Sequence, residues 1–220
     1  MTESSSPPQS KASYVLDRIR EDIAEGFIMP GQSLRQNELA VRYGVSSTPV
    51  REALRLLEAE GAITYAPHKG ATIAEMNPEQ IEDIYLMRLC VEGLATRLAV
   101  ERGPAESFNK AFEIHEQLCA RESEDPRELA LLNRRLHFEL YEIGSPWISN
   151  YVQGLWRFMP PELTTWTDDS ATETFIRQHK GIIEAIRHGD ALKAEHLMQD
   201  HIRTSMQFRL DQLAGHMDNS

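Results

Sequence analysis

The 220-residue sequence predicts a mainly α-helical protein in two parts: three helices with a small β-hairpin, followed by an all-helical bundle. Three observations predict this fold class. Apolar residues recur at helical spacing within residues 14–60. Two short strand-like segments follow, at 62–65 and 71–74. From Pro78 onward helical patterns alternate with Gly, Pro and polar residues, and the lack of strand-like alternation favours a bundle.

The first part begins with an expected helix from Tyr14 to Glu25, in which apolar residues recur every four positions. A short helix is expected from Gln36 to Tyr43, and Gly44 can end it in a left-handed conformation. A third helix follows directly, and either Ser46 or Thr48 can cap its start.

The third helix has an apolar side and a cationic side. Pro49 suits its first turn. Its apolar side consists of Val50, Ala53, Leu54 and Leu57. Arg51 and Arg55 lie one turn apart, so they share a face that can point away from the core. Two short helices joined by a Gly-containing turn are typical of a helix-turn-helix, whose second helix fits the DNA major groove. An ordinary two-helix hairpin with a solvated face would show the same spacing.

The strand pair after the third helix favours the DNA-binding interpretation. Its two strands are joined by Pro67-His68-Lys69-Gly70, which gives the hairpin a basic tip. A hairpin in this position is a wing that can reach phosphates or the minor groove. The first part is therefore predicted to be a winged helix-turn-helix.

Within residues 14–74 the chain has a long run of short motifs in a recognisable order: Pro30-Gly31, Leu34-Arg35, Glu38-Leu39-Ala40, Tyr43-Gly44-Val45, Thr48 to Leu54, Leu57-Glu58, Glu60-Gly61 and Pro67 to Ala71. In these residues the first part resembles the DNA-binding domain of GntR-type bacterial regulators. One departure is Ser47, where the family usually has an Arg that reads a base. The candidate DNA-binding residues are Arg35, Ser46, Ser47, Thr48, Pro49, Arg51, Arg55, His68, Lys69 and Gly70.

The distribution of charge separates the two parts. The chain has a formal net charge of −11. Residues 11–75 carry 8 Lys and Arg against 9 Asp and Glu, whereas residues 76–220 carry 15 against 24. Between Arg35 and Arg55 four Arg face only two Glu, so the expected DNA-binding surface is locally positive.

The remaining composition predicts a soluble, cytoplasmic protein. No apolar run is long enough to span a bilayer, and Met1 to Ser10 resembles a disordered tail rather than a signal peptide. Cys90 and Cys119 are far apart within helical patterns, so we expect core thiols rather than a disulfide or a Cys-based zinc site.

The expected domains are a tail at 1–12, the winged helix at 13–76, the helical domain at 77–214 and a tail at 215–220. Asn77-Pro78 is a strong helix start for the second domain. Its expected helices span 78–102, 104–123, 126–143, 147–158, 171–188 and 190–213.

Histidines lie on the apolar sides of three late helices, at His137, His179 and His201, and Asn133 lies one turn before the first of them. Convergence of three imidazoles would suit zinc, nickel, copper or iron. A single inward histidine is more often a hydrogen-bonded core residue, and periodicity also turns His115 inward. The pattern alone therefore leaves a metal site and a structural role open.

The second part contains a further series of motifs: Arg88 to Glu92, Asn133 to Phe138, Gln178-His179, Ala185 to Asp190, Ala194 and Asp200-His201. In these residues, 78–213 resemble the ligand-binding FCD domain of the FadR-like branch of the GntR family. In metal-binding members, an Asp or Asn and three His hold a divalent ion. The resemblance thus implies a site at Asn133, His137, His179 and His201, with zinc favoured and nickel or another ion open. Asn133 is the weakest match, because an amide oxygen binds a cation less strongly than a carboxylate does.

Arg88 and Glu92 lie one turn apart on the inner side of their helix. They could form a structural ion pair, or Arg88 could bind the carboxylate of a small effector while Glu92 orients it. Arg134 is a further candidate for the effector pocket. Trp147, Trp156 and Trp166 could line this pocket or pack in the core.

The expected function is that of a homodimeric, non-enzymatic transcription regulator. It would bind a short palindromic operator in double-stranded DNA and respond to a small organic-acid effector, without contact to a membrane. One alternative is a metal-dependent hydrolase that uses the three histidines. Another is a regulator whose histidine cluster is purely structural.

Overall fold

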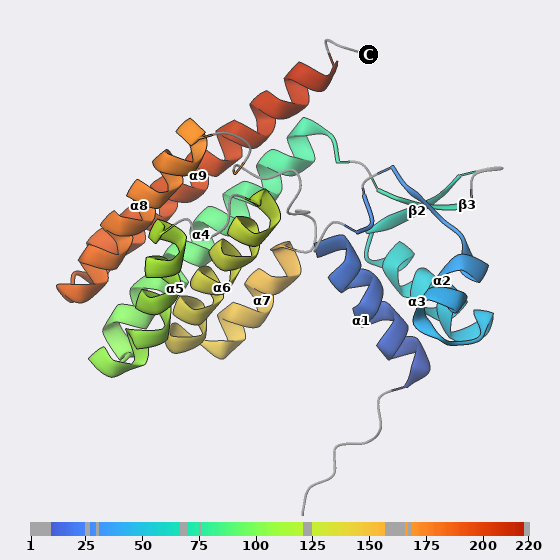
Figure 1. Cartoon of the computed structure of the whole chain (residues 1–220), viewed down its shortest axis with the longest axis horizontal. Helices are drawn as coiled ribbons and strands as arrows, with labels where there is room; N and C mark the ends of the chain where they lie inside the picture. The colour runs from blue at the N-terminus through green and yellow to red at the C-terminus, as the bar shows by residue number, and fades with distance from the viewer. Residues whose placement is uncertain are drawn as a thin grey trace, which may run out of the picture. The chain divides into compact units, whose positions relative to one another are not determined.

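The computed structural model describes residues 10–24, 27–29, 31–66, 70–74, 76–120, 125–156, 166 and 169–217 (Figure 1). The chain divides into two compact units, residues 1–75 and 76–220. Within the described ranges, no helix is long and apolar enough to cross a bilayer.

The first unit contains three helices and a small sheet. The helices are α1 (Lys11–Ala24), α2 (Gln36–Tyr43) and α3 (Ser47–Ala59). The strands are β1 (Ser33–Leu34), β2 (Ile63–Ala66) and β3 (Gly70–Ile73). All three strands are antiparallel, in the order β1-β3-β2. The predicted winged helix-turn-helix is confirmed, with β1 as an addition that the sequence patterns did not predict.

Apolar burial and two polar contacts fix the orientation of these helices. The core joins Ile19 of α1 to Val50 and Leu54 of α3, all with no exposed surface. The buried Asp22 carboxylate of α1 accepts a hydrogen bond from the Tyr43 hydroxyl at 2.6 Å and pairs with Arg42 at 2.9 Å. Asp22 therefore ties α1 to the end of α2, directly before the turn into α3.

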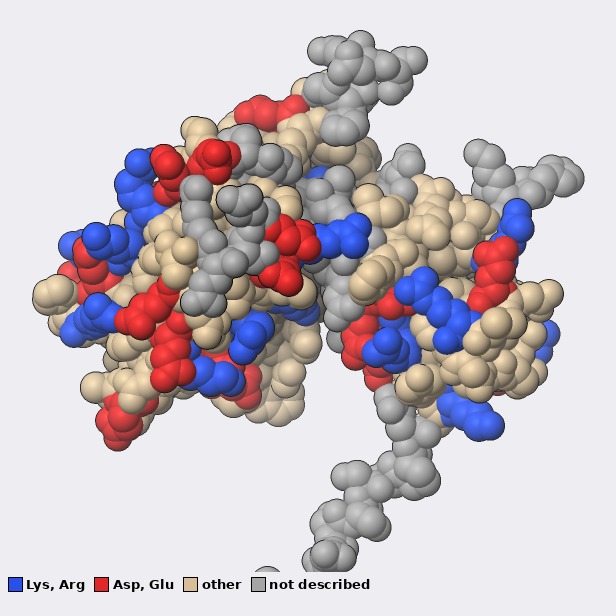
Figure 2. Space-filling model, in the orientation of Figure 1, with Lys and Arg blue, Asp and Glu red and all other residues tan. Residues whose placement is uncertain are grey.

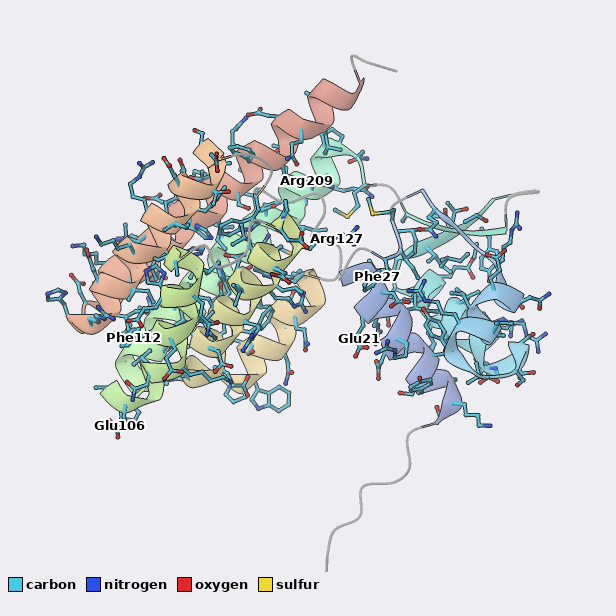
Figure 3. The ribbon with its side chains drawn as sticks, in the orientation of Figure 1. Glu21, Phe27, Glu106, Phe112, Arg127 and Arg209 are labelled. Atoms are coloured by element: carbon cyan, nitrogen blue, oxygen red, sulfur yellow. The ribbon has the colours of Figure 1, made fainter. Side chains whose placement is uncertain are left out.

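The second unit is a bundle of helices with the core at its centre. Its elements are α4 (Pro78–Arg102), the 3₁₀ helix η1 (Ala105–Phe108), α5 (Asn109–Ala120), α6 (Pro126–Gly144), α7 (Pro146–Trp156), α8 (Asp169–Arg187) and α9 (Ala191–Met217). Helices α4 and α9 pack along each other, and α4 also packs against α6 and α7. Phe112 of α5, labelled in Figure 3, lies under the Arg187 guanidinium of α8 at 4.7 Å from its ring centroid.

The start of α4 follows the sequence closely. The Asn77 side chain accepts a hydrogen bond from the Gln80 backbone, and the Gln80 side chain accepts one from the Asn77 backbone. This reciprocal capping satisfies two donors that the first turn of a helix leaves free, and Pro78 needs no donor of its own.

Three expectations about the second unit are wrong. The single helix expected over 104–123 is a 3₁₀ turn at Ala105–Phe108 followed by α5. Cys90 and Cys119 are exposed rather than core residues. Trp147 is 87% exposed at the start of α7, whereas Trp156 and Trp166 are buried.

Candidate metal centre and nucleic-acid interface

Gly44 and α3 form the turn and the exposed helix of the first unit. Gly44 has φ 66°, a left-handed conformation, and its backbone N–H bonds the carbonyls at the end of α2. Ser46 occupies the cap position of α3, but its side chain makes no capping hydrogen bond. The expectation of a side-chain cap from Ser46 is therefore wrong.

The outer face of α3 is polar and cationic. Arg51 and Arg55 are exposed, as are Ser47 and Thr48 in the first turn, whereas Pro49 is buried. The Ser47 hydroxyl donates to the Asn37 side-chain oxygen at 3.3 Å, across the turn from α2. This face therefore offers two guanidinium groups and two hydroxyls, the groups that bind phosphates and base edges.

Of the other candidate DNA-binding residues, Arg35 and Gly70 belong to the described part of the chain. Arg35 precedes α2, is exposed, and pairs with Glu38 at 3.2 Å. Gly70 begins β3 with φ 77°, opposite Ala66 in β2. His68 and Lys69 fall outside the described residues. Figure 2 shows Lys and Arg side chains interspersed with Asp and Glu on the visible faces of both units.

In the second unit, three helices bring three histidines together. His137 of α6, His179 of α8 and His201 of α9 are each at most 4% exposed. Their ligand nitrogens all lie within 4.8 Å of one another, and the Nε2 atoms of His137 and His179 are 3.1 Å apart. Two nitrogens that share one ion through bonds of about 2.1 Å lie about 3 to 3.4 Å apart. The His137–His179 pair thus has the spacing of two ligands of one ion, and the His201 ligand atom lies within 4.8 Å of both.

Hydrogen bonds set the tautomers of two of these rings. The Tyr141 hydroxyl donates to Glu92 at 2.5 Å, so its oxygen accepts from His137 Nδ1 at 2.7 Å. His201 Nδ1 bonds the side-chain oxygen of Gln178 at 3.1 Å. In both rings the proton is on Nδ1, which leaves the Nε2 lone pair free to bind a cation.

The Gln178 amide cannot be reversed without losing hydrogen bonds. Its Nε2 donates to the Thr204 hydroxyl at 2.9 Å, and that hydroxyl donates its only proton to the Asp200 carbonyl at 2.9 Å. The amide oxygen therefore faces His201 and must accept. This chain of bonds from the backbone of α9 holds the ring in the ligand tautomer.

The side chain of Asn133 tests whether these residues fit a metal. Its Oδ1 atom is buried and has no hydrogen-bond partner among the described residues, and the same is true of His179 Nδ1. A buried carbonyl oxygen without a partner costs stability unless a donor or a cation binds it. Asn133 lies one turn before His137 on α6, so three imidazoles and one amide oxygen fit a divalent transition-metal ion.

Burial keeps these histidines neutral. It lowers the pKa of His137, and it lowers the pKa values of His179 and His201 well below the ordinary value. Neutral imidazoles are the form that binds a metal. His115, which periodicity also turns inward, is buried on α5 beside Cys119 and is not part of the group of three.

Glu92 is the fully buried acceptor of this site. It receives hydrogen bonds from Arg88 Nε at 2.6 Å, Trp156 Nε1 at 2.9 Å and the Tyr141 hydroxyl. Burial alone would raise the pKa of Glu92. The Arg88 charge and the His137 side chain lower it by more than burial raises it, so the pKa falls to about 2. Arg88 and Glu92 are therefore an ion pair, 5% and 0% exposed.

The arginines of the site also stack on aromatic rings. The Arg88 guanidinium lies 4.8 Å from the Tyr85 ring centroid and 4.5 Å from that of Trp156. Arg134 lies over Phe138 at 5.1 Å and over Trp156 at 5.7 Å. Trp156 thus packs against both arginines that the sequence assigned to an effector.

Two residues of the site, Tyr141 and Gln178, had no role predicted from the sequence. Tyr141 follows His137 by one helical turn on the same apolar side, a signal that the spacing contained. Gln178 precedes His179, and only the packing of α8 on α9 brings it to His201.

Comparisons with known proteins agree with both units. Residues 11–73 match the family described as bacterial regulatory proteins, gntR family, and residues 83–204 match the FCD domain. The regulator McbR of Escherichia coli is 31% identical over 147 residues, which cover 66% of each chain. A probable D-xylose utilization operon transcriptional repressor of Paenarthrobacter nicotinovorans is 28% identical and covers 87% of this chain and 85% of its own.

The solved structure of E. coli McbR/YncC has the same fold. It superposes with a TM-score of 0.81 at 25% identity, covering 93% of this chain and 99% of that chain. The similarity therefore extends over both units.

Proposed function

Given that this chain belongs to the gntR family of bacterial regulatory proteins and carries an FCD domain, we propose that this DNA-binding transcriptional regulator is a homodimer controlled by a small carboxylate-bearing metabolite. The observation that carries the proposal is the exposed cationic face of α3 in one unit and the buried three-histidine cluster in the other. The first unit binds the operator, and the second unit senses the metabolite.

Each subunit places α3 in the major groove of one half of a short palindrome. Arg51 is the leading base-reading residue, and Arg35, Ser46, Ser47, Thr48, Pro49 and Arg55 with the wing residues His68, Lys69 and Gly70 contact neighbouring bases or phosphates. Because Ser47 is bonded to Asn37 and is much shorter than Arg, we propose that Arg51 carries more of the sequence discrimination.

Binding of the chain to the DNA upstream of its own gene tests this proposal. We expect a mobility shift at nanomolar to micromolar protein that survives excess random duplex and weakens steeply with salt. The shift should change when a panel of small carboxylates is added. A chain that binds its upstream DNA no better than random duplex, with every carboxylate tested, would refute the proposed regulator.

The metal proposal rests on the donor set. We propose that Asn133, His137, His179 and His201 hold a divalent transition-metal ion, with zinc the first choice and nickel an alternative. When bound, the ion supplies a Lewis-acidic position for a carboxylate oxygen. Glu92, through Tyr141, holds the His137 ring in place, and Gln178 does so for His201.

The arginines give the proposed effector pocket its second contact. Arg88 uses Nε to bind Glu92, so its two Nη groups are the donors that remain for an effector carboxylate. Arg134 is a further candidate for this contact. An effector that binds one arrangement of the dimer better than another shifts the DNA-binding equilibrium by its difference in affinity.

The charge of the donor set links metal and effector. Three neutral imidazoles and one amide leave both positive charges of a divalent ion uncompensated, and Glu92, the carboxylate bonded to this network, is already paired with Arg88. An anionic effector is therefore favoured at this site. The effector raises the affinity for the metal by the same factor by which the metal raises the affinity for the effector.

Replacing Asn133 with Asp is expected to raise metal affinity by about tenfold or more, because a carboxylate neutralises part of the ion's charge. The variant should also depend less on an added carboxylate. Competition with a metal-binding dye, in the presence and absence of acetate or succinate, measures both effects for zinc and nickel.

Asn109→Asp is the matched control, since it adds the same charge at an exposed position at the start of α5. We expect it to bind metal with wild-type affinity. Equal affinities for the Asn133→Asp and Asn109→Asp proteins would mean that Asn133 does not bind the ion.

We propose that this regulator is not an enzyme. Metal-dependent hydrolases commonly use a carboxylate that accepts a proton from water, in addition to the metal. Glu92 accepts three hydrogen bonds and has a pKa of about 2, so it is a poor base. The relatives compared above are named as transcriptional regulators, in agreement with a non-enzymatic role.

A further inference from the structure

Helix α7 has an exposed face that the described residues of its own unit leave uncovered. Trp147 is 87% exposed and Tyr151 58% exposed, although both are large aromatic residues. Asn150 is exposed on the same side, and Gly154 completes the stripe two turns after Trp147. Such a contiguous aromatic surface on a water-facing helix usually marks a binding site.

Gly154 has no structural reason within the described chain. A Cβ atom built there would meet no described atom within 4 Å, and its φ is not in the left-handed region. Gly144 differs, because a Cβ there would lie 2.5 Å from the Ala95 carbonyl of α4. Glycine inside a helix costs stability relative to alanine. A glycine facing open space therefore suggests close approach by another molecule.

The lack of charged residues on α7 favours a second copy of this chain as the partner. The stretch from Gly144 to Trp156 contains no Asp, Glu, Lys, Arg or His, although 26% of the chain is charged. Residues 76–220 carry 24 acidic against 15 basic residues, so two copies of this unit repel each other over most of their surfaces. A neutral aromatic face is where a second copy can approach without placing like charges together.

The positions along the stripe fit a twofold contact. Trp147 and Gly154 lie equally far from the midpoint between Asn150 and Tyr151. When two α7 helices cross antiparallel about an axis through this midpoint, Trp147 of each chain lies opposite the other's Gly154. The large exposed side chain of Trp147 would thus pack over Gly154, which has no side chain.

We propose that α7 forms the core of the homodimer interface, with Trp147 of each chain packed over Gly154 of the other. This inference rests on the homodimer proposed above. The 11 residues of α7 make a helix about 16 Å long. A stable interface needs about 1,200 Å² or more of buried surface, which is more than this stripe supplies. Helix α4, which packs against α7, also exposes Leu86, Met87 and Cys90, and the interface would need further surface of this kind.

Replacement of Trp147 with Glu tests the interface in the full-length chain. We expect sedimentation equilibrium to give a dimer dissociation constant at least 100-fold above wild type, because the change removes the aromatic contact and adds a like charge. Leu192→Glu is the matched control, since Leu192 is 59% exposed on α9 and lies outside this face. Its dissociation constant should stay within about threefold of wild type.

A second variant separates interface loss from unfolding. Gly154→Leu improves helix propensity, and the Cβ atom it adds meets no described atom in its own chain within 4 Å, so the monomer should unfold at the same or a higher temperature. Its dimer should nonetheless weaken at least tenfold. A variant that stays as dimeric as wild type would contradict the close approach at Gly154.

Cross-linking gives a positive test. In a Cys90→Ser, Cys119→Ser background, at a protein concentration where sedimentation still shows a dimer, a chain carrying both Trp147→Cys and Gly154→Cys should form an interchain disulfide on mild oxidation. A chain with Trp147→Cys alone should react much more slowly, because the two thiols lie about 10 Å apart along the helix axis.

Three results would overturn the proposal: a monomeric wild-type chain, an unchanged dimer in Trp147→Glu, or no disulfide in the double variant. An unchanged dimer in Trp147→Glu would assign this face to a partner other than a second copy of the chain. A wild-type dimer that depends on Trp147 but binds no duplex would support the interface and refute the proposed regulator.

Discussion

Replacement of Glu92 with Gln is expected to lower the free energy of unfolding of the helical unit by about 3 to 5 kcal/mol, because it leaves the Arg88 charge buried without its partner. Arg88 is only 5% exposed, and its Nε donates to Glu92 at 2.6 Å. The change also weakens the acceptor for Tyr141 and Trp156. Urea unfolding followed by tryptophan fluorescence measures this unit specifically, since all three tryptophans lie between residues 147 and 166.

Glu101→Gln is the matched control on the same helix. Glu101 pairs with Arg97 at 3.5 Å with 47% of its side chain exposed, so its loss should cost less than about 0.5 kcal/mol. Adding Arg88→Met to Glu92→Gln should restore part of the stability, because no buried charge then remains unpaired. A loss of under 1 kcal/mol in Glu92→Gln would show that the pair does not stabilise the bundle.

The pH dependence has a defined direction. In the unfolded chain a Glu titrates at about 4.3, whereas the pKa of Glu92 in the folded state is about 2. The unfolded state therefore binds the proton more strongly, and the contribution of Glu92 is present above about pH 4.3. It is lost as the pH falls from there through about 2, so the wild-type protein should approach the Gln variant in acid.

The local pattern predicted most of the fold, because amphipathic spacing and caps are local properties. Asn77-Pro78 and Gly44 marked a helix start and a helix end without knowledge of their surroundings. Strand β1 was not predicted, since two residues are too few to show alternation and only pairing with β3 defines them. Cys90 and Cys119 were misassigned because a helical pattern does not tell which side of a thiol-bearing helix is covered.

The candidate metal site was less accessible to pattern reasoning. Helical periodicity predicted that four histidines face the core. Only the family resemblance distinguished His115 from the three expected metal ligands. Glu92 bonds Tyr141 and Trp156, which are 49 and 64 residues away along the chain. Contacts of this kind depend on the packing of α4 against α6 and α7, which no spacing within one helix specifies.

The second large effect is expected in DNA binding, from a substitution on the exposed face of α3. Arg51→Ala should weaken operator binding by the dimer by about 30-fold to 10⁴-fold, because each half-site loses a base contact worth about 1 to 3 kcal/mol. The side chain is exposed and the buried side of α3 is unchanged, so the fold should be retained. Fluorescence anisotropy with operator and scrambled duplexes, over a range of salt concentrations, measures both affinity and specificity.

Two further variants separate base reading from attraction to phosphate. Arg51→Lys keeps the charge but loses the planar fork that binds guanine at two points. It should lose discrimination between operator and scrambled duplex while keeping nearly the same salt dependence. Arg18→Ala removes one charge from α1, where Arg18 is paired with Glu21, and should bind within about twofold of wild type. If Arg51→Ala weakened both duplexes equally, Arg51 would be a phosphate contact; if it weakened neither, α3 would not be the recognition helix.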